Sequence, residues 1–218
     1  MSITATFGAG GSEPYARALR DSDVLYLRST DGRGEPMDVG RWSARADLTD
    51  LTLLSSVTGP MLDIGCGPAR MVRAARELGI PALGIDVSPA AVRLARSEGI
   101  SVLEGSVFDR VPGEGEWQTA LLVDGNIGIG GDVSALLARC VQLITPDGEI
   151  VVEVSADPLQ HRTYTATVVD DRGGESAAFP WAEVGTLHLE RIARLAGLAP
   201  RASWQLGGRH FCRLAASR

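Results

Sequence analysis

The stretch MLDIGCGPAR, residues 61–70, decides how the fold of this chain is interpreted. It reads as a buried strand ending near Asp63, a tight turn through Gly65 and Gly67, and the first residues of a helix. Glycine allows the backbone to turn sharply and to approach a ligand, and the first turn of a helix presents unpaired N–H groups. The stretch therefore predicts a ligand-binding turn between a strand and a helix.

Two common glycine-rich turns do not match this stretch. A dinucleotide-binding turn needs G-x-G-x-x-G/A, but counting from Gly65 the last position is Arg70. A P-loop needs a lysine, and the chain contains none, since all 21 of its lysine-plus-arginine residues are arginine. The same composition excludes a Schiff-base lysine. An NAD(P)-dependent oxidoreductase is therefore the least favoured alternative.

Strand patterns and helical patterns alternate from residue 60 onward. The predicted strands span 60–65, 80–86, 100–105, 117–125 and 148–155, and the predicted helices span 69–79, 88–99, 132–145 and 183–198. Residues 200–216 are predicted to form a terminal hairpin around the pair Gly207–Gly208. This alternation is typical of an α/β protein with a parallel sheet and right-handed crossovers.

The pattern D-x-G-x-G-x-A, from Asp63 to Ala69, resembles motif I of the class I S-adenosylmethionine (SAM)-dependent methyltransferases, written E/D-x-G-x-G-x-G. In that family an acidic residue ending the second strand accepts hydrogen bonds from both ribose hydroxyls, and Asp86 stands there in this chain. The resemblance covers residues 58–155 by motif and extends to the C-terminus by topology. It implies a Rossmann-like, seven-stranded, mostly parallel sheet with an antiparallel C-terminal strand and helices on both faces.

The resemblance also implies a set of SAM-binding residues. The matching positions are Asp63, Gly65, Cys66, Gly67, Asp86, Val87, Ser106, Val107, Asp124 and Gly125. Ser106 departs from the family pattern, because an aspartate that accepts from the adenine amino group usually stands there. A serine hydroxyl can accept the same hydrogen bond, and the Val107 N–H can donate to the ring.

A second glycine-rich stretch, LLVDGNIGIGGD at 121–132, follows the fourth strand. In the family this strand end lies beside the methyl group, so Asp124 and Asn126 are candidate catalytic residues, and Glu153 near the end of the fifth strand is the third. Asn126 has an alternative role in pinning its own turn. The motif N/D-P-P-Y, typical of enzymes that methylate adenine or glutamine, is absent here. No spacing of ligands enforces a metal site, so none is predicted.

The composition narrows the partners of the chain. A formal net charge of −6 over 218 residues, with a pI near 5.1, disfavours nucleic acid, which needs a basic surface. No apolar run is long enough to span a membrane, and no leader pattern is present, so we expect a cytoplasmic protein. The three cysteines are widely spaced and predict neither a disulfide framework nor a zinc site.

We expect three segments along the chain: a flexible N-terminus at 1–12, a helical cap at 13–58, and a SAM-dependent methyltransferase domain at 59–218. Residues 156–182 are predicted to add a lid or hairpin to that domain. Aromatic residues are scarce, and several fall in the cap and in this insertion: Tyr15, Tyr26, Trp42, Phe179 and Trp181. They favour an apolar or aromatic acceptor. A homodimer through the terminal strands or the cap is expected from the fold.

The predicted function is transfer of a methyl group from SAM to an oxygen or nitrogen of a small molecule. The protein would act mainly by alignment, which supplies about 7–11 kcal/mol of the barrier in oriented reactions. Two alternatives stay open at this point: a SAM-binding enzyme that transfers another group, and a non-catalytic SAM-binding partner protein.

Overall fold

The computed structural model describes residues 6–8, 14–21 and 23–217, and its β-strands form two sheets. Most of the segment expected to be flexible, 1–12, lies outside the described residues. The larger sheet has seven strands in the order β10-β11-β7-β6-β3-β4-β5. Its strands are β3 (Met61–Ile64), β4 (Ala82–Asp86), β5 (Val102–Glu104), β6 (Trp117–Leu122), β7 (Ile144–Val154), β10 (Leu198–Leu206) and β11 (Arg209–Ala216).

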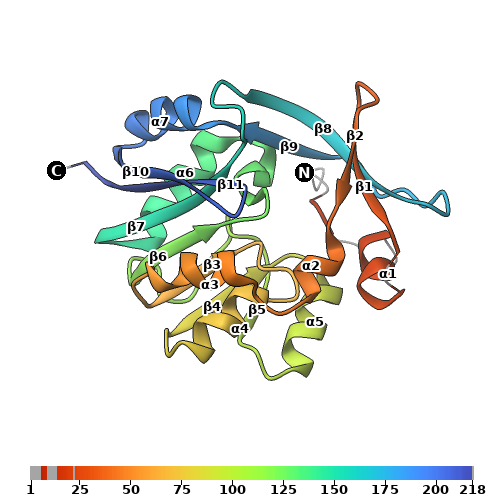
Figure 1. The fold of residues 1–218 in the computed structure, drawn as a ribbon, viewed down its shortest axis with the longest axis horizontal. Helices are drawn as coiled ribbons and strands as arrows, with labels where there is room; N and C mark the ends of the chain where they lie inside the picture. Colours follow the sequence, from red (N-terminus) through yellow and green to blue (C-terminus); the bar gives the residue numbers. More distant parts are fainter. Residues whose placement is uncertain (1–5, 9–13, 22, 218) are drawn as a thin grey trace.

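The order and directions of these strands confirm the predicted fold class. Strands β5, β4, β3, β6 and β7 are parallel neighbours, whereas β11 pairs antiparallel with β7, with Phe211 opposite Glu153. The terminal hairpin β10–β11 carries that antiparallel strand to the sheet. The chain therefore has the Rossmann-like sheet that the sequence predicts (Figure 1).

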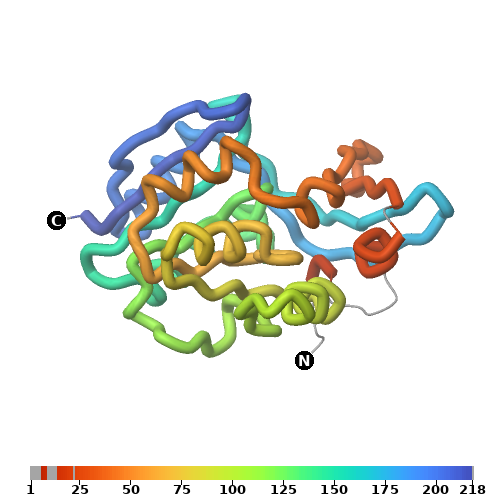
Figure 2. The backbone as a smooth tube through the Cα atoms, turned by 60° about the horizontal axis from the view of Figure 1, so that its bottom comes forward, coloured from red at the N-terminus to blue at the C-terminus, as the bar shows by residue number. Residues whose placement is uncertain are grey.

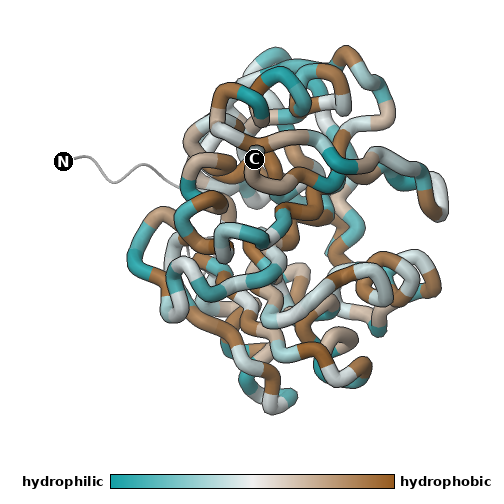
Figure 3. Tube along the Cα trace, turned by 90° about the vertical axis from the view of Figure 1, so that its left-hand side faces the viewer, coloured by the Kyte–Doolittle hydropathy of each residue, from teal (hydrophilic) through white to brown (hydrophobic). Residues whose placement is uncertain are grey.

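Helices cover both faces of this sheet because successive side chains of a strand point to opposite faces. In β3, Leu62 and Ile64 share a core with Leu136 and Leu189, whereas Met61 packs in the cluster of the opposite face. Hydrophobic and hydrophilic stretches alternate along the trace accordingly (Figure 3). Helices α3 (Leu48–Ser55), α4 (Arg70–Glu77) and α5 (Pro89–Ser97) pack on one face of the sheet, and α6 (Val133–Leu143) and α7 (Thr186–Leu195) pack on the other.

A second sheet of four strands, in the order β2-β1-β8-β9, lies at one end of the molecule. It joins a hairpin from the N-terminal segment to a hairpin formed between β7 and α7, and the two lie side by side (Figures 1 and 2). Its elements, with the adjoining short helices, are α1 (Pro14–Asp21), β1 (Leu25–Ser29), β2 (Gly34–Met37), α2 (Val39–Ser43), β8 (His161–Asp170) and β9 (Phe179–Val184).

The segment 13–58, expected to be a helical cap, contains helices α1, α2 and α3 but also strands β1 and β2. Strand β1 pairs with β8 from Leu25 opposite Asp170 to Ser29 opposite Ala166, so its hydrogen-bond partner comes from a distant part of the sequence. A short strand gives little local signal when such a partner stabilises it.

No helix among the described residues is both long and apolar enough to cross a membrane.

Candidate active site

A cavity of about 560 Å³ opens where the strand order of the large sheet reverses. From β3 the chain proceeds to β4 and β5 on one side, and then returns to β6 on the other side of β3. Ligands of open α/β sheets bind at the carboxyl ends of the strands at such a point. The cavity is lined by the ends of β3, β4 and β6 and, on the opposite side, by the second sheet and the N-terminal segment.

The glycine turn after β3 has the conformation that its sequence predicts. Gly65 and Gly67 have φ values of 73° and 53°, in the left-handed region that favours glycine. The Gly67 N–H donates to one carboxylate oxygen of Asp86 at 2.7 Å, and the Ser88 N–H donates to the other at 2.8 Å. A carboxylate offers about four lone-pair sites, so both oxygens of Asp86 keep a free site toward the cavity.

Asp63 is a buried carboxylate with an unsatisfied oxygen. The residue is only 1% exposed, and its Oδ1 atom has no hydrogen-bond partner among the described residues. Burial raises the pKa of Asp63 well above its usual range, and the nearby Asp124 and Asp86 raise it further. Because Asp63 lines the cavity, an entering cationic group would satisfy that oxygen and stabilise the ionised carboxylate.

The structure brings the expected cofactor-binding residues together at this one cavity. Every expected cofactor-binding residue lines the cavity: Asp63, Gly65, Cys66, Gly67, Asp86, Val87, Ser106, Val107, Asp124 and Gly125. The Ser106 hydroxyl accepts the N–H of Phe108 at 3.2 Å, which fixes the turn after β5. The grouping agrees with the family pattern.

Asp124 lies at the cavity within a cluster of opposite charges that the sequence did not predict. Its Oδ1 accepts from Arg41 at 3.0 Å and from Arg209 at 3.1 Å, and its Oδ2 accepts from Arg70 at 2.5 Å. The same three arginines also contact Asp50, whose side chain is fully buried. Three guanidinium groups thus occupy both carboxylate oxygens of Asp124.

Glu153 belongs to the same charged cluster and is absent from the described residues that line the cavity. Its Oε2 accepts the Asp124 N–H at 2.6 Å, and Arg209 donates to both of its oxygens. Glu153 lies two residues after Val151, which packs against α3 and α4, so the Glu153 side chain points to the face of the sheet that these helices cover. The geometry therefore favours a positioning role for Glu153 over the catalytic role expected from the sequence.

Asn126 holds the cofactor turn. Its side-chain Nδ2 donates to the carbonyl oxygens of Ile64 and Gly65, both at 2.9 Å. A Cβ atom at Gly65 would lie 2.8 Å from this amide, so glycine is required for the approach. Asn126 thus fixes the turn after β3, where the sequence suggested either contact with the acceptor or a bond within its own turn.

Two glycines of the second turn, Gly128 and Gly131, allow strand β9 to dock. Residues 126–131 form the short 3-10 segment η1, which is kinked at Ile129 and Gly130. A Cβ atom at Gly128 would lie 2.4 Å from the carbonyl oxygen of Ala182 and 2.7 Å from the Trp181 ring, and Gly131 likewise leaves room for Pro180. The second sheet therefore meets the carboxyl edge of the first at this turn.

We expect Gly128→Ala to lower the free energy of unfolding by about 1–3 kcal/mol, because the added methyl group overpacks the contact with β9. Gly34→Ala is the matched control, since a Cβ atom there meets nothing within 4 Å. Urea denaturation of both variants measures the effect. Equal stability of the two variants would contradict close docking of β9 at Gly128.

Two residues that line the cavity, Glu183 and Arg70, were not predicted as site residues from the sequence. Glu183 was assigned to a helix spanning 183–198, but it lies in β9, and α7 begins only at Thr186. Arg70 follows the glycine turn directly, yet nothing in its local sequence identifies Asp50 and Asp124 as its partners. Among the described residues, no group of three or more His, Cys, Asp or Glu side chains is arranged to hold a metal ion.

The sheet order, the glycine turn and the acidic residue at the end of β4 together give the chain the class I, Rossmann-like fold seen in SAM-dependent methyltransferases. Residues 62–152 match the family model described as "Methyltransferase domain". This part of the chain is therefore similar to a methyltransferase domain.

Solved structures share the fold over more than that domain. A SAM-dependent methyltransferase from Bacteroides fragilis, in complex with S-adenosyl-L-homocysteine, is 21% identical with a TM-score of 0.82, and the match covers 99% of each chain. The 1,6-didemethyltoxoflavin-N1-methyltransferase from Burkholderia thailandensis is 20% identical with a TM-score of 0.60, and the match covers 82% of this chain and 83% of that one. The first match includes the second sheet, so the described architecture is shared as a whole.

Proposed function

We propose that this chain transfers a methyl group from SAM to an oxygen or nitrogen atom of a small molecule bound between the two sheets. One observation carries the proposal: a single cavity connects the glycine turn and Asp86 with an aromatic end formed by the second sheet and the N-terminal segment. Similar proteins support it, since the related toxoflavin-pathway structure is described with bound 1,6-didemethyltoxoflavin, a small molecule, and S-adenosylhomocysteine.

The residues of the cofactor end suit the parts of SAM. The free lone pairs of Asp86 would accept from the two ribose hydroxyls, and the unsatisfied oxygen of Asp63 would accept from the methionine ammonium. Val87 and Val107 line the same cavity and offer apolar surface for the adenine. SAM carries its methyl group on a positively charged sulfonium. When the methyl group is transferred, the sulfur leaves as a neutral thioether, so no acid is needed to protonate the leaving group.

The chain contributes alignment and exclusion of water. Phe7 lies with its ring centroid 5.7 Å from Phe179 and 6.0 Å from Trp181, and Tyr15 lies 6.0 Å from Trp42. These are ordinary distances for packed aromatic rings. Phe7, Trp42 and Trp181 line the cavity, and the Tyr15 hydroxyl approaches the glycine turn, 3.2 Å from where a Cβ atom of Gly67 would lie. An acceptor held among these rings is fixed against the methyl group, and such alignment is worth about 7–11 kcal/mol in model reactions.

Calorimetry and labelling test the function in two steps. We expect SAM and S-adenosylhomocysteine to bind with a single site, and NADH not to bind. Incubation with methyl-labelled SAM and a small-molecule extract is expected to place label in the small-molecule fraction. Label found only in protein or nucleic acid would overturn the small-molecule assignment, and binding without any transfer would favour a non-catalytic SAM-binding protein. The homodimer and the cytoplasmic location stay predictions.

The raised pKa of Asp63 predicts that SAM binding depends on pH. Part of Asp63 is protonated in the free protein at pH values where an ordinary carboxyl is ionised, because burial raises its pKa. The SAM ammonium favours the ionised form, so binding releases a proton, and affinity rises as pH increases through the raised pKa.

Calorimetry in two buffers of different ionisation enthalpy measures this proton release. Asp63→Asn, which cannot ionise, is expected to release fewer protons on binding. Uptake of protons by the wild-type protein would contradict the assignment of Asp63 to the ammonium.

A further inference from the structure

The acceptor end of the cavity carries carboxylates that make no ion pair among the described residues. Glu35, Asp38 and Glu183 line it, and none of them lies within ion-pair distance of an arginine among the described residues. Arg162, which lies opposite Glu183 in the β8–β9 pair, is paired with Asp31 instead. Arg70 is the one basic side chain among the described lining residues, and it is already paired with Asp50 and Asp124. This end of the cavity is thus suited to a cation.

Glu183 is the best-defined of these carboxylates. Tyr164 donates its hydroxyl to Oε1 at 2.5 Å, and the Gln160 side-chain amide donates to Oε2 at 2.7 Å. Burial and the hydrogen bond to Glu183 raise the pKa of Tyr164, so the tyrosine stays a neutral donor. Two neutral donors fix the direction of the carboxylate and leave its full charge.

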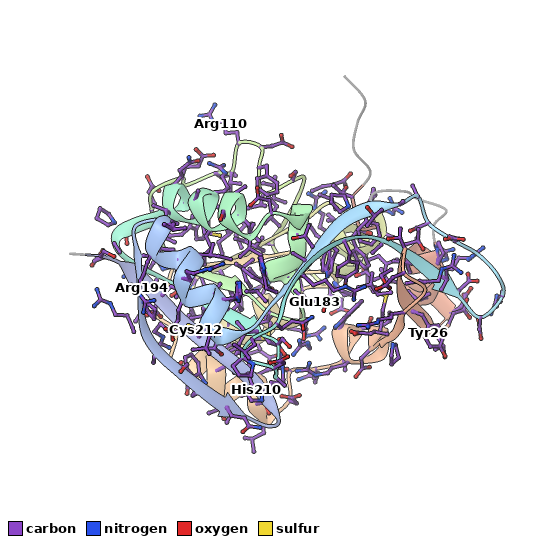
Figure 4. The ribbon with its side chains drawn as sticks, turned by 90° about the horizontal axis from the view of Figure 1, so that it is seen from above. Tyr26, Arg110, Glu183, Arg194, His210 and Cys212 are labelled. Carbon is purple, nitrogen blue, oxygen red and sulfur yellow. The ribbon has the colours of Figure 1, made fainter. Side chains whose placement is uncertain are left out.

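Glu183 also lies beside an aromatic wall. Trp181 is two residues earlier in β9 and points to the same face of the strand, and both line the cavity. Trp181 packs against Phe179 of the same strand and against Phe7 of the N-terminal segment. In Figure 4, Glu183 lies near the middle of the molecule, whereas Tyr26 of the same sheet lies at its outer end. The carboxylate is therefore on the inner side of the second sheet.

We propose that the methyl acceptor is an amine, positively charged in solution, on an apolar or aromatic body, and that Glu183 binds its nitrogen. The proposal rests on the function proposed above. A half-buried carboxylate held only by neutral donors gains most from a cationic partner, because burial of an unpaired charge is costly. The aromatic wall, headed by Trp181, holds the body of the amine and favours the cation.

The same contact accounts for the proton that an ammonium must lose before it can be methylated. The ammonium gives one proton to the Glu183 carboxylate, which frees the nitrogen lone pair. That lone pair forms the bond to the methyl carbon, and the electron pair of the broken carbon–sulfur bond stays on sulfur. The product leaves as the methylated ammonium, and Glu183 releases its proton to water. A hydroxyl acceptor would need no cation-binding carboxylate to enter the site.

The test compares 2-phenylethylammonium with 2-phenylethanol, an uncharged analogue of the same shape, as probes of protein saturated with S-adenosylhomocysteine. We expect the ammonium to bind about tenfold more tightly or better, in line with the value of a hydrogen bond to a charged group. Glu183→Gln is expected to remove this preference and leave the affinity for the alcohol unchanged. Equal binding of the two probes by the wild-type protein would overturn the proposal.

Control variants separate the outcomes. Glu116→Gln makes the same change of charge at an exposed position next to the amino end of β6, away from the cavity, and should keep the preference for the ammonium. Tyr164→Phe removes one donor to Glu183 and is expected to reduce the preference partly. Unchanged affinity of Glu183→Gln for S-adenosylhomocysteine shows that it is folded. If the wild-type protein itself did not bind S-adenosylhomocysteine, that result would instead refute the proposed function.

Discussion

Asp86→Ala is expected to weaken binding of SAM and S-adenosylhomocysteine by about a hundredfold or more. If SAM binds as proposed, the substitution removes two charge-assisted hydrogen bonds to the ribose, each worth about 1.5–3 kcal/mol. It also frees the N–H groups of Gly67 and Ser88, which Asp86 holds at 2.7 and 2.8 Å, so the glycine turn loses its fixed position. Isothermal titration calorimetry at constant pH measures the loss directly.

Two variants serve as comparisons for Asp86→Ala. Asp109→Ala removes a nearby exposed carboxylate that is not among the cavity-lining residues, and its affinity should equal that of the wild-type protein. Asp86→Asn keeps the size of the side chain but replaces one acceptor oxygen with a donor, so an intermediate loss is expected. Full affinity of Asp86→Ala would mean that the cofactor does not bind at this turn.

Asp50→Ala is expected to lower the free energy of unfolding by about 3–5 kcal/mol, the range for breaking a buried ion pair by removing one partner. The Asp50 side chain is fully buried and contacts the guanidinium groups of Arg41, Arg70 and Arg209. Loss of the Asp50 carboxylate leaves these three guanidinium groups with one counter-charge fewer. Urea denaturation, with constant slope in denaturant, measures the change.

The control for Asp50→Ala is Asp147→Ala, which removes an exposed carboxylate that has no ion-pair partner among the described residues. This variant should differ from the wild-type protein by less than about 0.5 kcal/mol. A loss below about 1 kcal/mol for Asp50→Ala would indicate that water or ions already screen the cluster. Reduced SAM affinity is a secondary expectation, because Asp124 shares these arginines at the edge of the cavity.

The local sequence was informative wherever the backbone itself had to be special. Gly65 and Gly67 adopt left-handed conformations, and Asp86 ends a strand next to them, so residue type and spacing carried the prediction. Ser88 and Asp132 begin the predicted helices 88–99 and 132–145, and the side chain of each caps its helix by accepting a backbone N–H. These features depend on interactions within a few residues or between adjacent strands.

The site residues whose roles changed are those whose partners lie far away in the chain. Glu153 was predicted to be a catalytic residue at the end of its strand. In the structure, Arg209 of β11 donates hydrogen bonds to both carboxylate oxygens of Glu153. Asn126 was assigned to the acceptor because its strand end faces the methyl group, yet its amide is used by the turn after β3. Sequence periodicity gives the face of a strand but not the side chain that another element brings to it.

The sequence by itself determined the α/β sheet, the cofactor turn and the acidic residue beside it, because a sharp turn needs glycine and ribose recognition needs a carboxylate at that position. Only the tertiary structure decided what surrounds the acceptor. Strand β1 meets β8, Gly128 admits β9, and Trp181 and Glu183 thereby reach the cavity. The β1–β8 pairing joins segments more than a hundred residues apart in the chain, and the Gly128–β9 contact joins residues more than fifty apart. The stability of both contacts comes from packing and pairing that no local pattern records.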